Sequence, residues 1–213
     1  VVELQSQVLP PLDPEMATPI AEELVAHGVE LILSDSVARF DAAGSRLKVT
    51  LASGKTIETD LVLLGVGVRP DNGLALQAGL DVGPRGGIKT NSEMRTSDPF
   101  IYAVGDAVET FDFVTHDPIQ VPLAGPANRQ GRIAADNIMG LKSRYRGTQG
   151  TAIVRVFGKV AALTGQSEKN LTRAKKPFRK IYVHPAHHAG YYPGAEQMTL
   201  KVLFREEDGR LLG

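Results

Sequence analysis

The segment at residues 96–106 reads TSDPFIYAVGD and decides how this chain is interpreted. Residues 100–104 are a short apolar run of β-prone side chains, a pattern typical of a strand buried on both faces of a parallel sheet. Gly105 would end this strand, and Asp106 would place a carboxylate at its carboxyl end. Ligands of open α/β sheets bind at this edge. Because Gly105 has no Cβ, a ligand could approach the backbone closely, and Asp106 could accept hydrogen bonds from ligand hydroxyl groups.

A strand followed by an ordinary Gly-Asp turn or helix cap would also explain this segment, so the rest of the chain must decide. The order of residues from Thr96 to Asp106 resembles the second flavin motif of the FAD- and NAD(P)-dependent disulfide reductases. This resemblance implies that FAD and NAD(P)H are the cofactors, that Asp106 binds the ribitol of FAD and that Gly105 contacts the same cofactor.

The resemblance covers nearly the whole chain and implies an α/β fold. It predicts parts of two Rossmann-like dinucleotide-binding domains, for NAD and FAD, followed by part of an α+β dimerisation domain. Residues 1–70 would belong to the NAD(P)-binding domain, residues 71–148 to the FAD-binding domain, and residues 149–213 to the first half of the dimerisation domain. Because the chain starts inside a predicted strand without a methionine, we expect it to be a segment of a longer protein.

The composition is that of an ordinary globular protein, with 42% hydrophobic and 23% charged residues. Lys+Arg and Asp+Glu number 24 each, which gives no electrostatic footprint for nucleic acid or an acidic membrane. No apolar run approaches the roughly 20 residues that cross a bilayer. We therefore predict a cytoplasmic protein that binds neither nucleic acid nor membranes. The chain has no cysteine, which excludes disulfides, thiolate metal sites and a cysteine nucleophile within it.

Local patterns predict most helices and strands. Residues 13–28 carry a capping Asp-Pro pair, helical spacing of apolar residues and a terminal glycine. Residues 47–58 alternate around a Ser-Gly turn, as in a β-hairpin. Further helices are predicted at 74–78, 121–139 and 171–176, and further strands at 29–33, 61–64, 152–157, 160–165, 178–183 and 198–204.

Two residues in the first third are candidate cofactor contacts. Glu3 lies at a predicted strand end, where an acidic residue can hold the ribose 2′-hydroxyl of a dinucleotide, although a solvated strand end fits equally well. Such a carboxylate would favour NAD over NADP because it repels a 2′-phosphate. Gly67 belongs to GVGVRP at residues 65–70, which turns tightly at a sheet edge. The resemblance implies that this segment closes the nicotinamide domain beside the cofactor, whereas a plain crossover turn is the alternative.

The helix predicted from residue 121 onward supplies another candidate contact. A helix N-terminus offers free N–H groups and a partial positive charge, which could stabilise negative charge on a reduced flavin. The resemblance implies that Leu123 and Ala124 contact the flavin through their backbone, and that Asn128 lies beside a substrate disulfide. For Arg132, a solvated helix position is the expected role.

Residues 184–195 read HPAHHAGYYPGA. The three histidines suggest a metal site, but Pro185 and Gly190 disfavour a helix and no carboxylate stands among them, so no metal is predicted. The stretch resembles coenzyme A-disulfide reductases and their persulfide-reducing relatives. It implies a homodimer in which Tyr191 or Tyr192 reaches the partner's substrate site, where a phenol could donate a proton to a leaving thiolate. A packed interface loop is the alternative and is compatible with the same role.

The predicted function is therefore part of a flavoprotein oxidoreductase that passes electrons from NAD(P)H through FAD to a coenzyme A disulfide or persulfide. The resemblance places the redox cysteine upstream of these residues. An NADH oxidase or peroxidase of the same fold is one alternative, and a non-catalytic dimerisation module is another. The isolated chain is expected to be inactive because it contains neither a glycine fingerprint nor a thiol.

Overall fold

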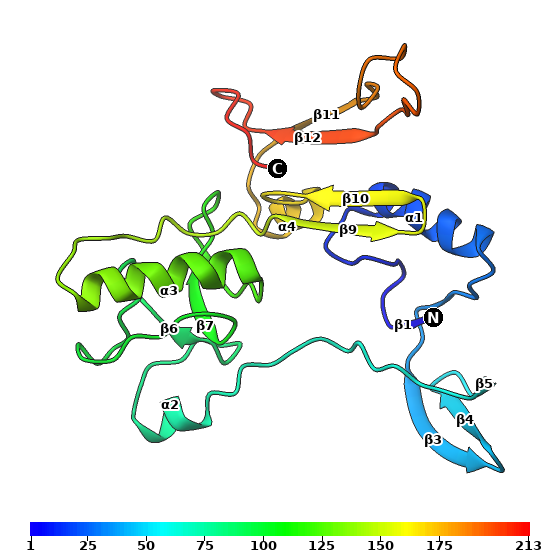
Figure 1. The fold of residues 1–213 in the computed structure, drawn as a ribbon, viewed down its shortest axis with the longest axis horizontal. Helices are drawn as coiled ribbons and strands as arrows, with labels where there is room; N and C mark the ends of the chain where they lie inside the picture. The colour runs from blue at the N-terminus through cyan, green and yellow to red at the C-terminus, as the bar shows by residue number, and fades with distance from the viewer. The chain divides into compact units, whose positions relative to one another are not determined.

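A computed structural model describes residues 1–213, which divide into two compact units (Figure 1). Unit 1 consists of Val1–Gly65 and Ala152–Gly213, and unit 2 consists of Val66–Thr151. Unit 1 contains β1 (Val2–Glu3), α1 (Pro14–Ala26), β2 (Ile32–Leu33), β3 (Val37–Ala43), β4 (Arg46–Leu51), β5 (Thr56–Thr59), β9 (Ala152–Val156), β10 (Lys159–Leu163), α4 (Glu168–Arg173), β11 (Arg179–Val183) and β12 (Leu200–Phe204). Unit 2 contains α2 (Gly73–Gln77), β6 (Ile88–Lys89), β7 (Val108–Phe111), β8 (Pro118–Ile119) and α3 (Ala124–Ile138).

Helix α1 forms where the sequence predicts it. Pro14 stands at the first helical turn, and Gly28 follows the helix with φ +79°, a conformation that glycine adopts without strain. Ala17 and Ile20 are the buried residues of the helix, and α1 packs against the β9–β10 hairpin. His27 stacks on Phe157 in the turn of that hairpin, with ring centroids 4.0 Å apart. The first and last segments of the sequence are thereby joined within unit 1.

Most other strands of unit 1 form three antiparallel sheets. The predicted hairpin is present as β4 and β5, and β3 adds a third strand on the other side of β4. The alternation in β4 buries Val49 and Leu51, as expected for a strand with one face on a core. The β9–β10 hairpin also matches the prediction, and the two strands predicted at 178–183 and 198–204 are present as β11 and β12, which pair with each other. Leu171 in α4 and Leu203 in β12 are buried in this part of unit 1.

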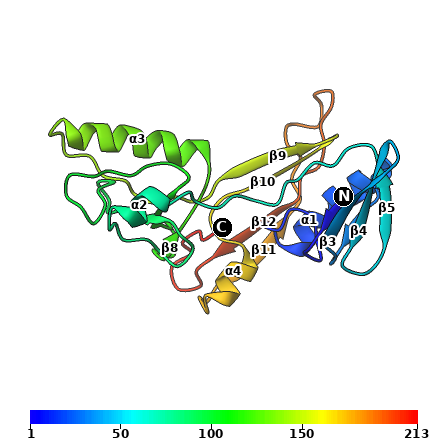
Figure 2. The same ribbon diagram turned by 90° about the horizontal axis from the view of Figure 1, so that it is seen from below.

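Unit 2 is a small α/β unit. Strands β6 and β7 pair in parallel, β8 adds an antiparallel edge, and α3 lies along one side of the unit (Figures 1 and 2). Its core contains Met94, Val108, Ala134 and Tyr145, so it joins α3 to β7.

Two predicted strands are wrong. Phe100–Val104 is not a strand, and Phe100 is 90% exposed, while β7 begins after Asp106 instead. The physical reason is that this segment folds back on its own neighbours: the N–H of Ala103 donates to Met94 (3.1 Å) and the N–H of Thr96 donates to Ile101 (2.9 Å). Leu61–Leu64 is also outside any strand, because no other strand of the chain pairs with it. Leu63 in this segment is 87% exposed.

Candidate functional site

The Gly-Asp turn lies between the apolar run of residues 100–104 and the start of β7. Gly105 has φ +89°, in the left-handed region that disfavours residues with a Cβ. Its N–H donates to the side-chain Oε1 of Gln130 over 2.8 Å, and its carbonyl accepts from the N–H of Val108. A Cβ on Gly105 would meet no atom within 4 Å, so the glycine is required here by the backbone angle.

Asp106 is exposed, and its carboxylate takes part in no hydrogen bond or ion pair within the chain. It lies on the wall of a pocket of about 840 Å³ that belongs entirely to unit 2. This pocket contains two guanidinium groups, two carboxylates and two side-chain amides. They belong to Arg69, Arg85, Asp71, Asp106, Asn72 and Gln120. The pocket therefore offers acceptors for hydroxyl groups and cations for an anionic group.

The start of α3 lies where the sequence predicts it. Leu123 occupies the N-cap position with an extended backbone, and no side chain caps the helix. Ala124 and Asn128 are exposed in the first turns, and Pro122, just before the helix, lines the pocket beside Asp106. The predicted contacts of Leu123 and Ala124 with a flavin, and of Asn128 with a substrate, remain predictions.

Glu3 and Gly67, the two candidates in the first third of the chain, do not line the pocket that contains Asp106. Gly67 has φ +87° and precedes Val68 and Arg69 of the pocket wall, but it does not itself line the pocket. Glu3 ends β1, which pairs in parallel with β2 in unit 1. Its Oε1 accepts a hydrogen bond from the N–H of Gln5 at 2.8 Å. A ribose hydroxyl bound to Glu3 would share this carboxylate with the N–H of Gln5.

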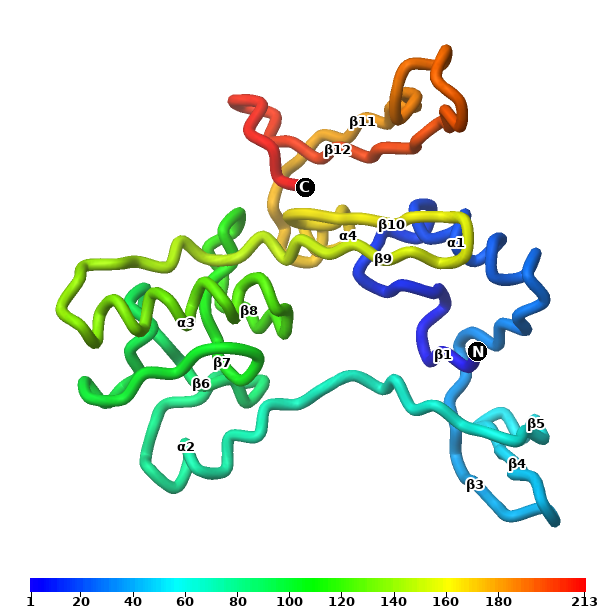
Figure 3. The backbone as a smooth tube through the Cα atoms, in the orientation of Figure 1, coloured from blue at the N-terminus to red at the C-terminus, as the bar shows by residue number.

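The loop between β11 and β12 carries the two predicted tyrosines (Figure 3). Tyr191 is 83% exposed and Tyr192 is 59% exposed, with ring centroids 4.8 Å apart. His188 contacts Tyr192 edge-on at 6.3 Å. Nδ1 of His187 accepts from the N–H of Glu196, so that ring supports the loop. The tyrosine faces are thus presented to solvent on a hydrogen-bonded loop.

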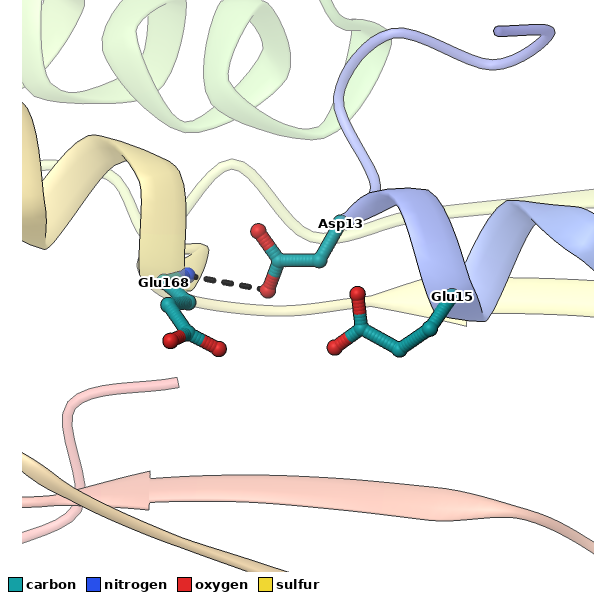
Figure 4. Close-up of side chains that lie close together, drawn as sticks. All are labelled: Asp13, Glu15 and Glu168. Carbon is teal, nitrogen blue, oxygen red and sulfur yellow. Dashed lines mark hydrogen bonds between the residues drawn. The ribbon is translucent and has the colours of Figure 1, made fainter.

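Sequence reasoning missed a cluster of three carboxylates in unit 1. Asp13, Glu15 and Glu168 bring carboxylate oxygens within 4.8 Å of one another (Figure 4). The ammonium of Lys201 already lies among them, 2.9 Å from Asp13 and 2.5 Å from each glutamate, and its side chain is 4% exposed. The cation of this cluster is therefore the protein's own lysine, and we assign the cluster a structural role.

This arrangement shifts the pKa values of three of these groups, and that of Glu168 is lowered by hydrogen bonds from Lys180 and Lys201. Burial alone would raise the pKa of Glu15, but hydrogen bonds from Lys201 and Tyr182 outweigh it and lower the pKa to about 2. Burial likewise opposes the charge on Lys201, yet its hydrogen bonds with Glu15, Glu168 and Asp13 raise the pKa of the ammonium. Glu15 and Lys201 therefore both carry their charge at neutral pH.

The prediction that the side chain of Asp13 caps α1 is wrong. Its two carboxylate oxygens instead accept from the N–H groups of Glu168 (2.9 Å) and Lys169 (3.1 Å), at the start of α4. No local pattern reveals a partner that is 155 residues distant.

The residues around Asp106 suit part of a flavin dinucleotide. A polyol needs acceptors such as a carboxylate, a pyrophosphate needs cations, and both are present in one pocket. The Asp106 carboxylate has no internal partner, and the space beside Gly105 is open to a close approach. The pocket residues missed from the sequence alone include Asp71, Asn72, Arg85 and Gln120, and no spacing rule connects the loops that carry them.

An α/β unit with a Gly-Asp turn over a polar pocket, next to a helix start, is typical of dinucleotide-dependent oxidoreductases. Comparison with known proteins gives the family. Residues 1–131 match the sequence model of the family described as Pyridine nucleotide-disulphide oxidoreductase, and the chain belongs to this family.

Three similar proteins illustrate the match. An NADH oxidase from Methanocaldococcus jannaschii is 33% identical, over 100% of this chain and 47% of the relative. A CoA-dependent NAD(P)H sulfur oxidoreductase from Pyrococcus abyssi is 34% identical, over 92% of this chain and 44% of the relative. The structure of reduced Bacillus anthracis CoADR-RHD has 45% identity and a TM-score of 0.94, over 99% of this chain and 38% of that one. The chain thus spans less than half the length of these relatives.

These findings confirm the predicted family, the α/β fold class, and FAD and NAD(P)H as the cofactors of the family. The boundaries at residues 70 and 148 and the individual site residues stay predictions. No helix of the chain combines the length and apolar character needed to cross a membrane.

Proposed function

We propose that the full-length protein transfers electrons from NAD(P)H through FAD to a coenzyme A disulfide or persulfide. The observation that carries this proposal is the Gly105–Asp106 turn, whose unengaged carboxylate borders a polar pocket. The names of the relatives support it, since one is a CoA-dependent sulfur oxidoreductase and a solved neighbour is a CoADR.

On the cofactor side, Asp106 would accept hydrogen bonds from the ribitol hydroxyls of FAD, and the backbone of Leu123 and Ala124 at the start of α3 would contact the flavin. Bound FAD supplies the electron transfer between the nicotinamide and the substrate sulfur. The protein's part is to orient the flavin and to provide positive potential beside it. In this proposal Glu3 would hold the ribose 2′-hydroxyl of a dinucleotide, and Gly67 would be a separate cofactor contact.

On the substrate side, Asn128 contacts the substrate, and Tyr191 or Tyr192 donates a proton to the departing thiolate. The exposure of both rings on a loop supports this role, because an exposed phenol is available to a second molecule. We propose a cytoplasmic homodimer in which this loop serves the site of the partner subunit. The isolated 213-residue chain has no cysteine to relay electrons, so by itself it is inactive in disulfide reduction.

The cofactor role is tested by flavin titration. The full-length protein and its Asp106→Asn variant are stripped of flavin, and FAD binding is followed by flavin fluorescence. Loss of the charged acceptor is expected to weaken binding by about tenfold or more. Asp117→Asn changes an exposed carboxylate outside the pocket and is the matched control. Equal FAD affinity in the three proteins would refute the role of Asp106.

The substrate class is tested by turnover. With NADH as reductant, coenzyme A disulfide and coenzyme A persulfide should be reduced, and a Tyr191→Phe or Tyr192→Phe variant should lose kcat with little change in NADH binding. Rapid oxygen consumption without disulfide or persulfide turnover would favour the NADH oxidase alternative, which the relative from Methanocaldococcus jannaschii supports by its name. Absence of all three activities in a flavin-loaded protein would remove the proposal.

A further inference from the structure

Gln130 is a buried polar side chain that the proposed function does not yet use. It lies in the second turn of α3 and is 2% exposed. A buried amide needs hydrogen-bond partners, because leaving it unpaired costs about 1–3 kcal/mol. Its Oε1 has one in the N–H of Gly105, 25 residues earlier in the chain, at 2.8 Å.

The geometry of Gly105 explains why a side chain must provide this acceptor. With φ +89°, the backbone turns its N–H away from the path of the preceding residues and toward α3. The backbone carbonyls in the interior of a helix are taken by N–H groups four residues later. A side-chain oxygen on the helix is therefore the available acceptor, and glutamine supplies it without burying a charge.

Gln130 also belongs to a face of α3 that fixes the helix on unit 2. Ala134, four residues later, packs in the core with Met94 and Val108. Asn137, seven residues after Gln130, donates from Nδ2 to the carbonyls of Ile133 and Ser143 at 2.8 Å. Spacing of four and seven residues places these side chains on one side of the helix. Two amides and a small apolar residue thus determine how α3 lies against the Gly-Asp turn.

We propose that Gln130 is a positioning residue that holds the Gly105–Asp106 turn and the start of α3 in one fixed arrangement for the flavin. This inference rests on the proposed role of Asp106. Gln130 does not touch the ligand. It sets the left-handed conformation of Gly105, which aims Asp106, and it ties that turn to the helix that begins at Ala124.

The test uses the full-length protein with two substitutions of similar size. Gln130→Met removes the acceptor, whereas Gln130→Glu keeps an oxygen at the same position. Arg129→Met, on the exposed neighbouring position, is the control. FAD affinity is measured by fluorescence titration well below the melting temperature of each protein. Exchange of the Gly105 amide is measured by hydrogen–deuterium exchange in the flavin-free protein.

The expected results separate positioning from general stability. Gln130→Met should weaken FAD binding about tenfold and should speed exchange of the Gly105 amide. Gln130→Glu should keep most of the affinity and the protection, even though a buried carboxylate lowers its melting temperature. If Gln130 only stabilised the fold, FAD affinity would fall in step with the melting temperature. Gln130→Glu would then bind FAD more weakly than Gln130→Met, and this result would overturn the inference.

The outcomes also distinguish this inference from the proposed function. If the unaltered protein binds no FAD, the proposed function fails, while the amide exchange still reports on the hydrogen bond. If the unaltered protein binds FAD and Gln130→Met binds it equally well, the positioning role is refuted. If Gln130→Met does not fold, the Gln130→Glu variant decides: retained affinity supports the role and lost affinity refutes it.

Discussion

Replacement of Lys201 by methionine is predicted to be among the most destabilising single changes in unit 1. The side chain of Lys201 is 4% exposed, and its ammonium forms ion pairs with three carboxylates. Figure 4 shows how these carboxylates lie together. Methionine keeps a similar volume, so the change mainly removes the charge and its hydrogen bonds. Asp13, Glu15 and Glu168 would then repel one another without a cation between them.

The magnitude follows from how exposed the three carboxylates are. Breaking a buried ion pair by removing one partner typically costs about 3–5 kcal/mol. Only Asp13 is fully buried here, with 6% side-chain exposure, whereas Glu15 and Glu168 are 44% and 27% exposed. Water can therefore relieve part of the repulsion, and we expect a loss near the lower end, about 3 kcal/mol.

The assay is urea-induced unfolding of the flavin-free protein, followed by circular dichroism and evaluated as the free energy of unfolding. Lys180→Met is the matched control, because Lys180 also pairs with Glu168, at 2.8 Å, but is 43% exposed. The loss of this exposed ion pair should destabilise the protein much less than the loss of Lys201 does. Equal destabilisation by the two variants, or a loss under about 1 kcal/mol for Lys201→Met, would show that the buried ammonium does not hold this cluster together.

Three further predictions concern stability. Because the pKa of Glu15 is lowered from 4.5 to about 2, its contribution is present above pH 4.5 and lost as the pH falls toward 2, so a Glu15→Gln variant should flatten the acid limb of a urea-midpoint profile. Gly54→Ala should lower the free energy of unfolding by about 1–2 kcal/mol because of the left-handed φ of Gly54. Gly147→Ala should lower it by about 1–3 kcal/mol more than Gly54→Ala does, because its Cβ would stand 2.7 Å from a backbone oxygen. Denaturant midpoints compare the two variants. Asp13→Ala should lower the melting temperature because α4 loses its cap, whereas Asp106→Ala should leave the melting temperature nearly unchanged. Calorimetry measures both melting temperatures, and a larger drop for Asp106→Ala would contradict this prediction.

Much of the fold is predictable because its signals are local. The alternation of Leu47, Val49 and Leu51 specifies a strand with one buried face, and the glycine turn after it closes the hairpin. Helix α1 carries a proline at its start and a glycine after its end, and both act within one turn of the backbone. Such elements need no information from distant segments.

The two failed strands show where local signals end. A continuous apolar run such as residues 61–64 or 100–104 is compatible with a buried strand, but a strand also needs a neighbour that pairs with its N–H and C=O groups. In this structure no strand pairs with residues 61–64, and residues 100–104 form only an isolated bridge, between Tyr102 and Arg95. Pairing depends on segments far away in sequence, so the apolar pattern alone cannot predict it. The partner of Asp13 at the start of α4 escaped prediction for the same reason.

Some parts of the candidate site are likewise specified by local sequence, and others depend on distant segments. The turn at Asp106 and the start of α3 are each specified by adjacent residues, so the sequence alone is sufficient to locate them. The pocket around them draws on Arg69, Arg85 and Gln120, which come from three separate loops. The role of Gln130 required its distance from Gly105.

The two sets of carboxylates in this chain differ in a way that bears on function. Asp13 is buried, and its oxygens are already engaged by two backbone N–H groups and an ammonium. Those contacts stabilise the fold and leave little capacity for a ligand. Asp106 is exposed, lies on a pocket wall and has no internal partner, while its backbone neighbour is held in a conformation that few residues adopt. A carboxylate that contributes nothing to folding, carried on a turn that a buried glutamine fixes, is placed for a molecule from outside the chain.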